Sequence, residues 1–235
     1  MTSRSYRGSP LVPPRRVTRH ATLFLASANP GKLREFREAA SACGISVEAV
    51  PGIQTLPPCV EDGASFEENA RKKALHYSVL IANRVFADDS GISVDALGGL
   101  PGVYSARFAG RDANDKTNNQ KLLKELRQLE EAANIRSVQP QDRAPICRAA
   151  HYVCVIALAE QGRTLTVVQG RADGLIIDKP RGRGGFGYDP LFLYPPLGKT
   201  FAELSPEDKF AVSHRGAAFR KLLDYLAAQS VSRRT

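Results

Sequence analysis

Two adjacent carboxylates, Asp88 and Asp89, follow an apolar run in the stretch RVFADDSGI (residues 84–92). Neighbouring negative charges repel, and burying either one is costly unless a cation lies nearby. Magnesium typically takes one or two protein carboxylates, several waters and the phosphate oxygens of a substrate. Asp89, together with Glu61 in a preceding loop, would supply these two carboxylates. The pattern favours a magnesium site at the carboxyl edge of a sheet; an acidic turn that caps the next segment is the alternative.

A second candidate is the turn SANPGK (residues 27–32), which lies between an apolar strand and a helix that starts at Lys32. The free N–H groups and the positive dipole at a helix N-terminus favour a phosphate. Ser27 and Asn29 add neutral donors, and Lys32 adds a charge. The spacing is not that of a Walker loop. Taken alone, the segment is better explained as an ordinary strand–helix turn with an asparagine cap and a surface lysine.

The next polar group lies on a helix that begins at Ser65, where Ser65 and Glu68 form a capping box. Asn69 and Lys73 are four residues apart, so they share one face of this helix. A well-capped amphipathic helix with solvated charges is the simpler interpretation of this segment alone.

Two further segments indicate a pocket for a planar base. In GGFGYDP (residues 184–190) the glycines let the backbone approach a ligand, and Phe186 between them could stack on a base, with Asp189 near the base edge. The alternative is a β-turn with Phe186 in the core.

The second of these segments lies nearer the end of the chain. In DKFAVSHRGAAF, Lys209 precedes a Ser-capped helix whose first turn holds His214 and Arg215. Basic residues oppose the dipole at that end, which favours a role facing an anion or an electron-rich base edge. Two solvent-facing residues that tolerate the position are the alternative.

The elements that position these groups alternate between strands and helices. Strands are expected over 22–27, 45–50 and 84–88, helices over 32–43, 65–81, around Leu122–Leu129 and from 213, and a β-hairpin over 149–177 with its turn at Gln161–Gly162. Residues 130–148 are polar and indicate a surface connection. The order predicts an α/β fold with a mixed central sheet flanked by helices, a β-rich second lobe and a substrate cleft between the lobes.

Composition restricts the class of protein further. The chain has 235 residues, a net charge of +9 and 43% hydrophobic residues. The first twenty residues carry five arginines and no acid, so we expect 1–20 to be a disordered basic tail and 21–230 a single two-lobed domain. An organelle transit peptide is the alternative for this tail, although its prolines interrupt an amphipathic helix.

The cysteines and the hydropathy bear on location and partners. The four cysteines lack CxxC spacing and no apolar run reaches the length of a membrane span, which fits a cytoplasmic protein. We therefore expect no membrane partner and, because the body of the chain is only slightly basic, no specific nucleic-acid partner.

Taken together, the five segments are far more specific than any one of them. SANPGK, FEENARKKA, ADDSGISVDALGGLPGVYSARFAG, GGFGYDPLF and KFAVSHRGAA occur in an order and spacing that resemble the non-canonical purine nucleoside triphosphate pyrophosphatases, the inosine/xanthosine triphosphate pyrophosphatase family. The resemblance covers Thr22 to Ala228. It implies a homodimer with a central cleft that uses Mg²⁺ to hydrolyse ITP, dITP and XTP to the monophosphate and pyrophosphate.

The resemblance also implies a role for each matching residue. Asp89 matches the catalytic carboxylate and Glu61 the metal-binding acid, although Val60 stands where many members carry a second acid. The remaining matches are the substrate-binding residues: Ser27, Asn29, Lys32 and Lys73 for the triphosphate, Ser90 for a further contact, Phe186, Gly187, Tyr188 and Asp189 for the base, and Lys209, His214 and Arg215 for the other side of the base pocket.

The chemistry of the residues agrees with this role. Release of pyrophosphate needs attack at the α-phosphorus, and cations oppose the charge that grows on the leaving oxygens. Three alternatives remain open: a pyrophosphatase for other modified bases, a nucleotide-binding sensor without hydrolysis, and a nucleic-acid-binding module that uses the basic tail. The last of these does not explain the acids at 61 and 89.

Overall fold

The structure is a computed structural model, and it describes residues 22–41, 44–136 and 147–232. The expectations for the basic tail over 1–20, for Cys43 and for most of the polar connection over 130–148 lie outside these ranges. Within them, the expected alternation of strands and helices is confirmed.

A seven-stranded mixed sheet forms the centre of the molecule, in the order β2-β1-β3-β4-β5-β6-β7. Strand β1 pairs in parallel with both β2 and β3, whereas every later pair is antiparallel. The strands are β1 (Thr22–Leu25), β2 (Ser46–Ala49), β3 (Arg84–Val94), β4 (Ala149–Glu160), β5 (Arg163–Ile176), β6 (Phe192–Tyr194) and β7 (Lys199–Thr200). The α/β class and the mixed sheet are therefore confirmed.

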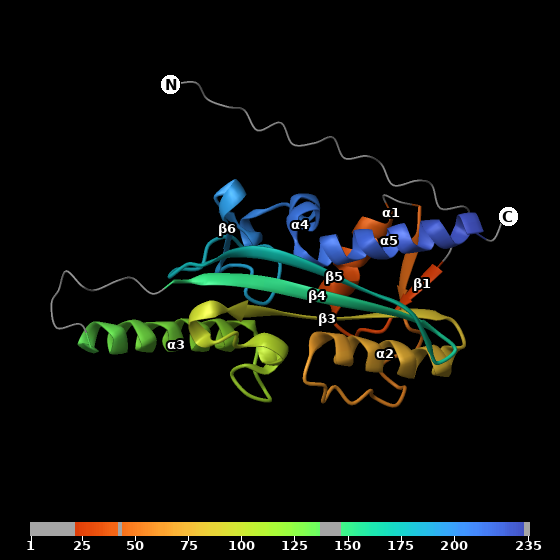
Figure 1. Ribbon diagram of the computed structural model, residues 1–235, viewed down its shortest axis with the longest axis horizontal. Coiled ribbons are helices and arrows are strands. Elements are labelled where there is room, and N and C mark those ends of the chain that lie inside the picture. The colour runs from red at the N-terminus through yellow and green to blue at the C-terminus, as the bar shows by residue number, and fades with distance from the viewer. Residues whose placement is uncertain (1–21, 42–43, 137–146, 233–235) are drawn as a thin grey trace, which may run out of the picture.

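Helices cover both faces of this sheet (Figure 1). On one face lie α1 (Pro30–Ser41), α4 (Pro206–Val212) and α5 (His214–Ser232); on the other lie α2 (Phe66–Ile81) and α3 (Asp115–Arg136). Phe36, Phe86 and Phe219 pack together between the first set and the sheet, with ring centroids 5.2 Å apart for Phe36 and Phe86. Because apolar residues alternate along β3, Val85 and Ala87 face α2 and pack with Ala70 and Ala74.

Strand β3 is longer than the sequence predicted. We expected it to end at Asp88, but it continues to Val94. Its parallel partner β1 stops pairing at Leu25, opposite Phe86, whereas β4 pairs with β3 along its whole length and keeps the backbone extended. Asp88 and Asp89 therefore lie inside a strand, just beyond the carboxyl end of β1.

The β4–β5 hairpin turns at Gln161–Gly162, as predicted, and both strands continue past the end of β1. Together with β6, β7 and α3 they form the β-rich end of the molecule (Figure 1). A second cluster of buried side chains, which includes Ile92, Leu122, Leu126 and Phe192, fills that end. The division of the chain at residue 21 stays a prediction. No helix in the described ranges is both long enough and apolar enough to cross a bilayer.

Candidate active site

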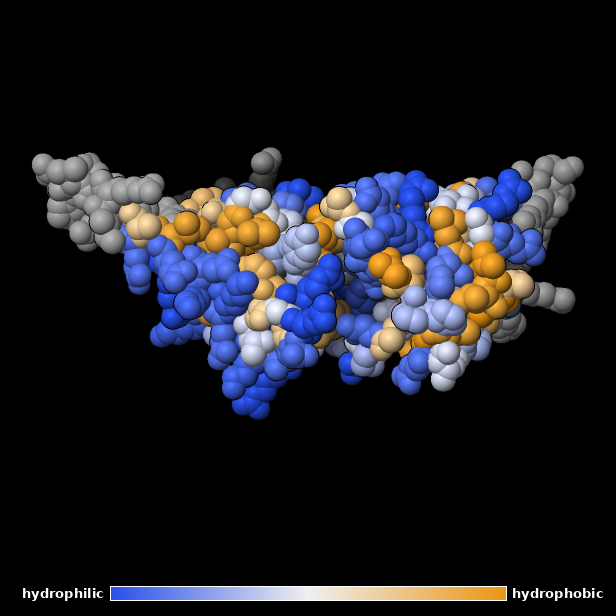
Figure 2. Space-filling model, turned by 90° about the horizontal axis from the view of Figure 1, so that it is seen from below, coloured by the Kyte–Doolittle hydropathy of each residue, from blue (hydrophilic) through white to orange (hydrophobic). Residues whose placement is uncertain are grey.

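A cavity of about 550 Å³ opens where the end of β1 leaves β3 uncovered, between the α2 side and the α3 side of the molecule. Figure 2 views the molecule from the face that carries α2 and α3, and it shows the hollow between the α2 end and the α3 end of the molecule. Every site residue predicted from the sequence lines the cavity except Lys209. The expected cleft is therefore present, and the segments that predict it meet there.

The two adjacent acids point to opposite faces of the sheet because they are consecutive residues in an extended strand. Asp88 meets Lys32 from α1, and Asp89 meets Asn69 and Lys73 from α2. The repulsion that made the pair conspicuous in the sequence is reduced by this separation. Neither acid caps the next segment, and only Asp89 lines the cavity.

Asp88 is a buried anion that holds cations in place. Its Oδ2 lies 2.9 Å from Nζ of Lys32 and 3.8 Å from Nε of Arg215, and it accepts a hydrogen bond from Ser90 Oγ at 3.1 Å. Burial alone would raise the pKa of this carboxyl, but the nearby cations, Lys32 first, lower the pKa to about 2. Asp88 is not among the site residues predicted from the sequence.

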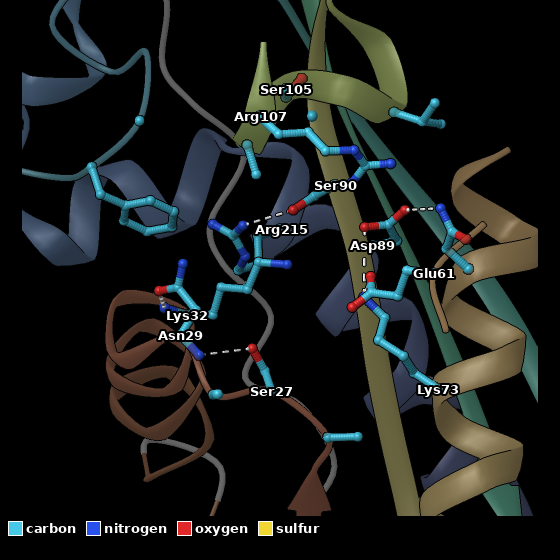
Figure 3. A pocket seen from close by; sticks show the side chains of 18 of the residues that line it. Ser27, Asn29, Lys32, Glu61, Lys73, Asp89, Ser90, Ser105, Arg107 and Arg215 are labelled. Carbon is cyan, nitrogen blue, oxygen red and sulfur yellow. Dashed lines mark hydrogen bonds and ion pairs between the residues drawn. The ribbon is translucent and has the colours of Figure 1, made fainter. Parts of the chain in front are cut away.

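Glu61, Lys73 and Asp89 form the acidic wall of the cavity (Figure 3). Nζ of Lys73 lies 2.7 Å from Oε2 of Glu61 and 3.6 Å from Oδ1 of Asp89. Asn69 donates a hydrogen bond to Oδ2 of Asp89 at 3.1 Å. Burial raises the pKa of Asp89, and the positive charge of Lys73 only partly opposes this. Both carboxylates thus converge on one cationic group.

This convergence fits a magnesium ion. In the described part of the chain no group of three or more His, Cys, Asp or Glu side chains could hold a metal. Two carboxylates that share one cation are nevertheless the usual protein contribution to a Mg²⁺ site, whose other ligands are waters and phosphate oxygens. Glu61 and Asp89 are therefore the two side chains that could hold such an ion.

The Ser27–Lys32 turn differs in one respect from the expectation of free backbone N–H groups. Asn29 Oδ1 accepts hydrogen bonds from the N–H groups of Gly31 and Lys32, at 2.9 and 3.2 Å, and Asn29 N–H donates to Ser27 Oγ. Asn29 therefore caps α1, because these two amides have no partner inside the helix. The turn offers a ligand its side chains more than the amides of Gly31 and Lys32.

The loop over 184–190 is fixed by its own residues. Oδ2 of Asp189 accepts the Phe186 N–H at 2.8 Å and lies 2.5 Å from Nζ of Lys209. The hydroxyl of Tyr188, a buried residue, donates to the carbonyl of Ser105 at 2.8 Å. Asp189 and Tyr188 therefore shape the loop, and the half-buried ring of Phe186 is left at the cavity.

Gly31 explains where the Phe186 ring lies. A Cβ atom on Gly31 would come 2.8 Å from Cδ1 of Phe186, so only glycine lets this ring pack on the start of α1. Nζ of Lys209 and Cζ of Arg215 lie 4.9 and 5.2 Å from the ring centroid, within the range of cation–π attraction. The ring is thus fixed among cations rather than in the apolar core.

Glu35 connects two of the predicted basic residues. Its carboxylate lies 2.5 Å from Nη1 of Arg215 and 2.6 Å from Nζ of Lys209. Lys209 belongs to α4 and is buried behind the cavity instead of lining it, which differs from its predicted contact with the base. Sequence reasoning missed Glu35, although its position three residues after Lys32 on α1 puts the two on neighbouring turns.

His214 begins α5, where Ser213 Oγ accepts the Gly216 N–H at 3.1 Å and caps the helix. The imidazole stacks on Tyr152, with centroids 4.5 Å apart and planes 7° from parallel. Burial, followed by the charges of Arg215 and Lys209, holds the pKa of His214 well below its ordinary value, so the ring is neutral at pH 7. Its Nδ1 is buried without a hydrogen-bond partner in the described residues.

The cavity therefore combines cationic and acidic side chains with an aromatic ring, an arrangement that can bind a polyanion together with a cation. The model of the Ham1 family matches residues 23–225, and the chain belongs to the Ham1 family. This confirms the family resemblance inferred from the five segments.

Relatives and a solved structure cover most of the chain. The dITP/XTP pyrophosphatase of Desulfotalea psychrophila is 42% identical over 200 residues, which are 85% of this chain and 82% of that protein. The dITP/XTP pyrophosphatase of Geobacillus kaustophilus is 44% identical over 201 residues, 85% and 91% of the two chains. The structure of a HAM1 protein from Coxiella burnetii aligns with a TM-score of 0.73 and 36% identity, over 88% of this chain and 98% of the other.

Proposed function

We propose that this protein hydrolyses the non-canonical purine nucleoside triphosphates dITP, ITP and XTP to the monophosphate and pyrophosphate, and so clears them from the nucleotide pool. The observation that carries the proposal is a single cavity with Glu61 and Asp89 on one wall and Lys32 and Arg215 on another, next to the Phe186 ring. The names of the relatives described above support the same substrates.

The reaction follows from the positions of the charges. Attack of water at the α-phosphorus develops negative charge on the leaving pyrophosphate, which the positive charges of Lys32 and Lys73 would oppose. Asp89, held by Asn69, would orient the attacking water or accept its proton. A Mg²⁺ ion held by Glu61 and Asp89 would neutralise charge on the phosphate oxygens.

Selectivity follows from hydrogen-bond donors beside the ring of Phe186. Hypoxanthine and xanthine present an acceptor oxygen at the purine 6-position, whereas adenine presents an amino donor. Arg215 and the neutral imidazole of His214 can donate to that oxygen, and a mismatched donor leaves buried polar groups unpaired. Such a mismatch can reject a wrong ligand by a factor of about 10⁴.

We also propose a cytoplasmic homodimer. Location in the cytoplasm follows from the substrate pool. Leu100 and Tyr104, two large side chains that are exposed, offer apolar area for a second copy of the chain. Light scattering combined with size-exclusion chromatography should give twice the mass of the chain.

The test is a measurement of pyrophosphate release from ITP, XTP, ATP and GTP, with and without added magnesium. We expect release from ITP and XTP that depends on magnesium and greatly exceeds release from ATP. Faster turnover of dTTP or dCTP than of ITP would favour a pyrophosphatase for other bases. Tight ITP binding without any release would favour a sensor.

A further inference from the structure

Among the residues that the structure describes, one cationic side chain of the cavity forms no ion pair with a carboxylate. Arg107 lines the same cavity as Lys32, Lys73 and Arg215, and its side chain is exposed. Figure 3 shows Arg107 reaching into the pocket from the side away from the turn that carries Asn29 and Lys32. The only charge-type contact found for its guanidinium, among the described residues, is with the Tyr104 ring, 5.3 Å from the centroid.

The other cavity cations are already neutralised by the protein. Lys32 lies against Asp88, Lys73 against Glu61 and Asp89, and Arg215 against Glu35. An incoming polyanion must compete with these carboxylates for each of the three. Within the described ranges, Arg107 is the cavity cation whose charge is free to be met by a ligand.

The backbone that carries Arg107 is held on two sides. Arg107 ends the 3₁₀ helix η2 (Gly102–Arg107), and Asn118 of α3 donates to the carbonyl of Ala106 at 3.1 Å and accepts the N–H of Ala109 at 2.8 Å. These two bonds bracket Arg107. The residue therefore combines a fixed backbone with a free charged group.

The start of η2 is fixed equally well to β3. Ser105 Oγ accepts the N–H of Ile92 at 2.9 Å and donates to the carbonyl of Gly102 at 2.6 Å. A Cβ atom on Gly91 would overlap both Ser105 Oγ and the Gly102 carbonyl, so η2 packs this closely only because residue 91 is glycine. Since Gly91 directly follows Ser90, η2 lies beside the segment that carries Asp89.

We propose that Arg107 binds phosphate oxygens of the nucleotide triphosphate, and of the pyrophosphate product, from the wall opposite the Ser27–Lys32 turn. This inference rests on the proposed function. A guanidinium presents a planar fork that bonds two phosphate oxygens at once, which a lysine at this position would not do. The fixed backbone lets the side chain meet the phosphates without rearrangement of η2.

The test compares Arg107→Gln with Arg111→Gln, a matched change to an exposed arginine that lies outside the cavity. For Arg107→Gln we expect kcat/KM for ITP to fall by about 10- to 100-fold, and inhibition by pyrophosphate to weaken by a similar factor. Inhibition by IMP, which lacks the outer phosphates, should stay within about twofold of the wild-type protein. Arg107→Lys should recover part of the loss, and Arg111→Gln should match the wild-type protein.

Two results would overturn the role of Arg107: an unchanged kcat/KM and pyrophosphate inhibition, or an equal weakening of IMP and pyrophosphate, which would indicate a structural effect. The proposed function fails separately, if the wild-type protein releases no pyrophosphate from ITP. In that case calorimetric titration of wild-type protein and Arg107→Gln with pyrophosphate still decides whether Arg107 binds phosphate.

Discussion

The ammonium nitrogen of Lys32 lies 2.9 Å from Oδ2 of Asp88, a carboxylate without exposed surface. Arg215 approaches the same oxygen, at 3.8 Å. A buried carboxylate between two cations sets the positions of both, because moving either one would leave charge uncompensated. The Ser27–Lys32 turn and the start of α5 are thus held in fixed positions relative to one another by a residue that does not line the cavity.

Replacing this buried anion should therefore destabilise the protein. We expect Asp88→Asn to lower the free energy of unfolding by about 3 kcal/mol, because two cations lose their counter-ion. Urea denaturation followed by circular dichroism measures the change. Asp62→Asn, which removes an exposed ion pair with Lys72, is the control and should stay close to the wild-type value. Equal stability of the two variants would show that Asp88 does not hold the cluster together.

Glu35 should govern base discrimination without touching the ligand's phosphates. Glu35→Gln removes the charge that fixes Arg215 and Lys209, so we expect the ratio of kcat/KM for ITP over ATP to fall by about tenfold. Steady-state pyrophosphate release from both nucleotides gives this ratio. Glu38→Gln, on the exposed side of the same helix, should leave it unchanged. A fall in activity toward both nucleotides alike would contradict a role in discrimination.

His214 makes stability depend on pH on the acid side of neutrality. Its folded pKa lies below the unfolded value of about 6.5, so the unfolded chain takes up a proton first as the pH falls. The free energy of unfolding should then decrease below about pH 6.5, with a slope that approaches about 1.4 kcal/mol per pH unit from this group. The contribution of neutral His214 to the free energy of unfolding is fully present above about pH 6.5.

The difference between wild-type protein and His214→Gln isolates this contribution, because other titrating groups, His151 among them, occur in both proteins. Unfolding free energies measured from pH 8 to pH 5 should run parallel above pH 7 and converge below pH 6.5. Parallel curves over the whole range would mean that His214 is not held neutral by burial.

Sequence reasoning identified the residues around the cavity because their types are unusual for their local positions. Basic residues at the start of a helix oppose its dipole, and a phenylalanine between glycines has few neighbours in the sequence to pack against. Residues of both kinds lie at the cavity. The fold class could be predicted from the hydrophobic pattern, because the strands of this sheet are short apolar runs or alternate between polar and apolar residues.

What the sequence did not reveal depends on contacts between distant elements. The strand was expected to end at Asp88 because nothing local shows that β4 continues to pair beyond it. Because the strand was expected to end there, the sequence did not show that Asp88 and Asp89 are consecutive strand residues, which point to opposite faces of the sheet. Glu35 and Arg107 escaped notice because a glutamate on an amphipathic helix and an arginine in a loop are common, and only the tertiary packing gives them partners or a cavity.

The measurement that tests the central claim most directly is the effect of Asp89→Asn on ITP binding and on pyrophosphate release in one preparation. The variant loses the proposed catalytic carboxylate and keeps Lys32, Lys73 and Arg107, so we predict ITP affinity within about threefold of wild type and at least a 100-fold lower rate of release. Asp95→Asn, an acid outside the cavity near the end of β3, should retain the full rate. Unchanged pyrophosphate release by Asp89→Asn would contradict the account.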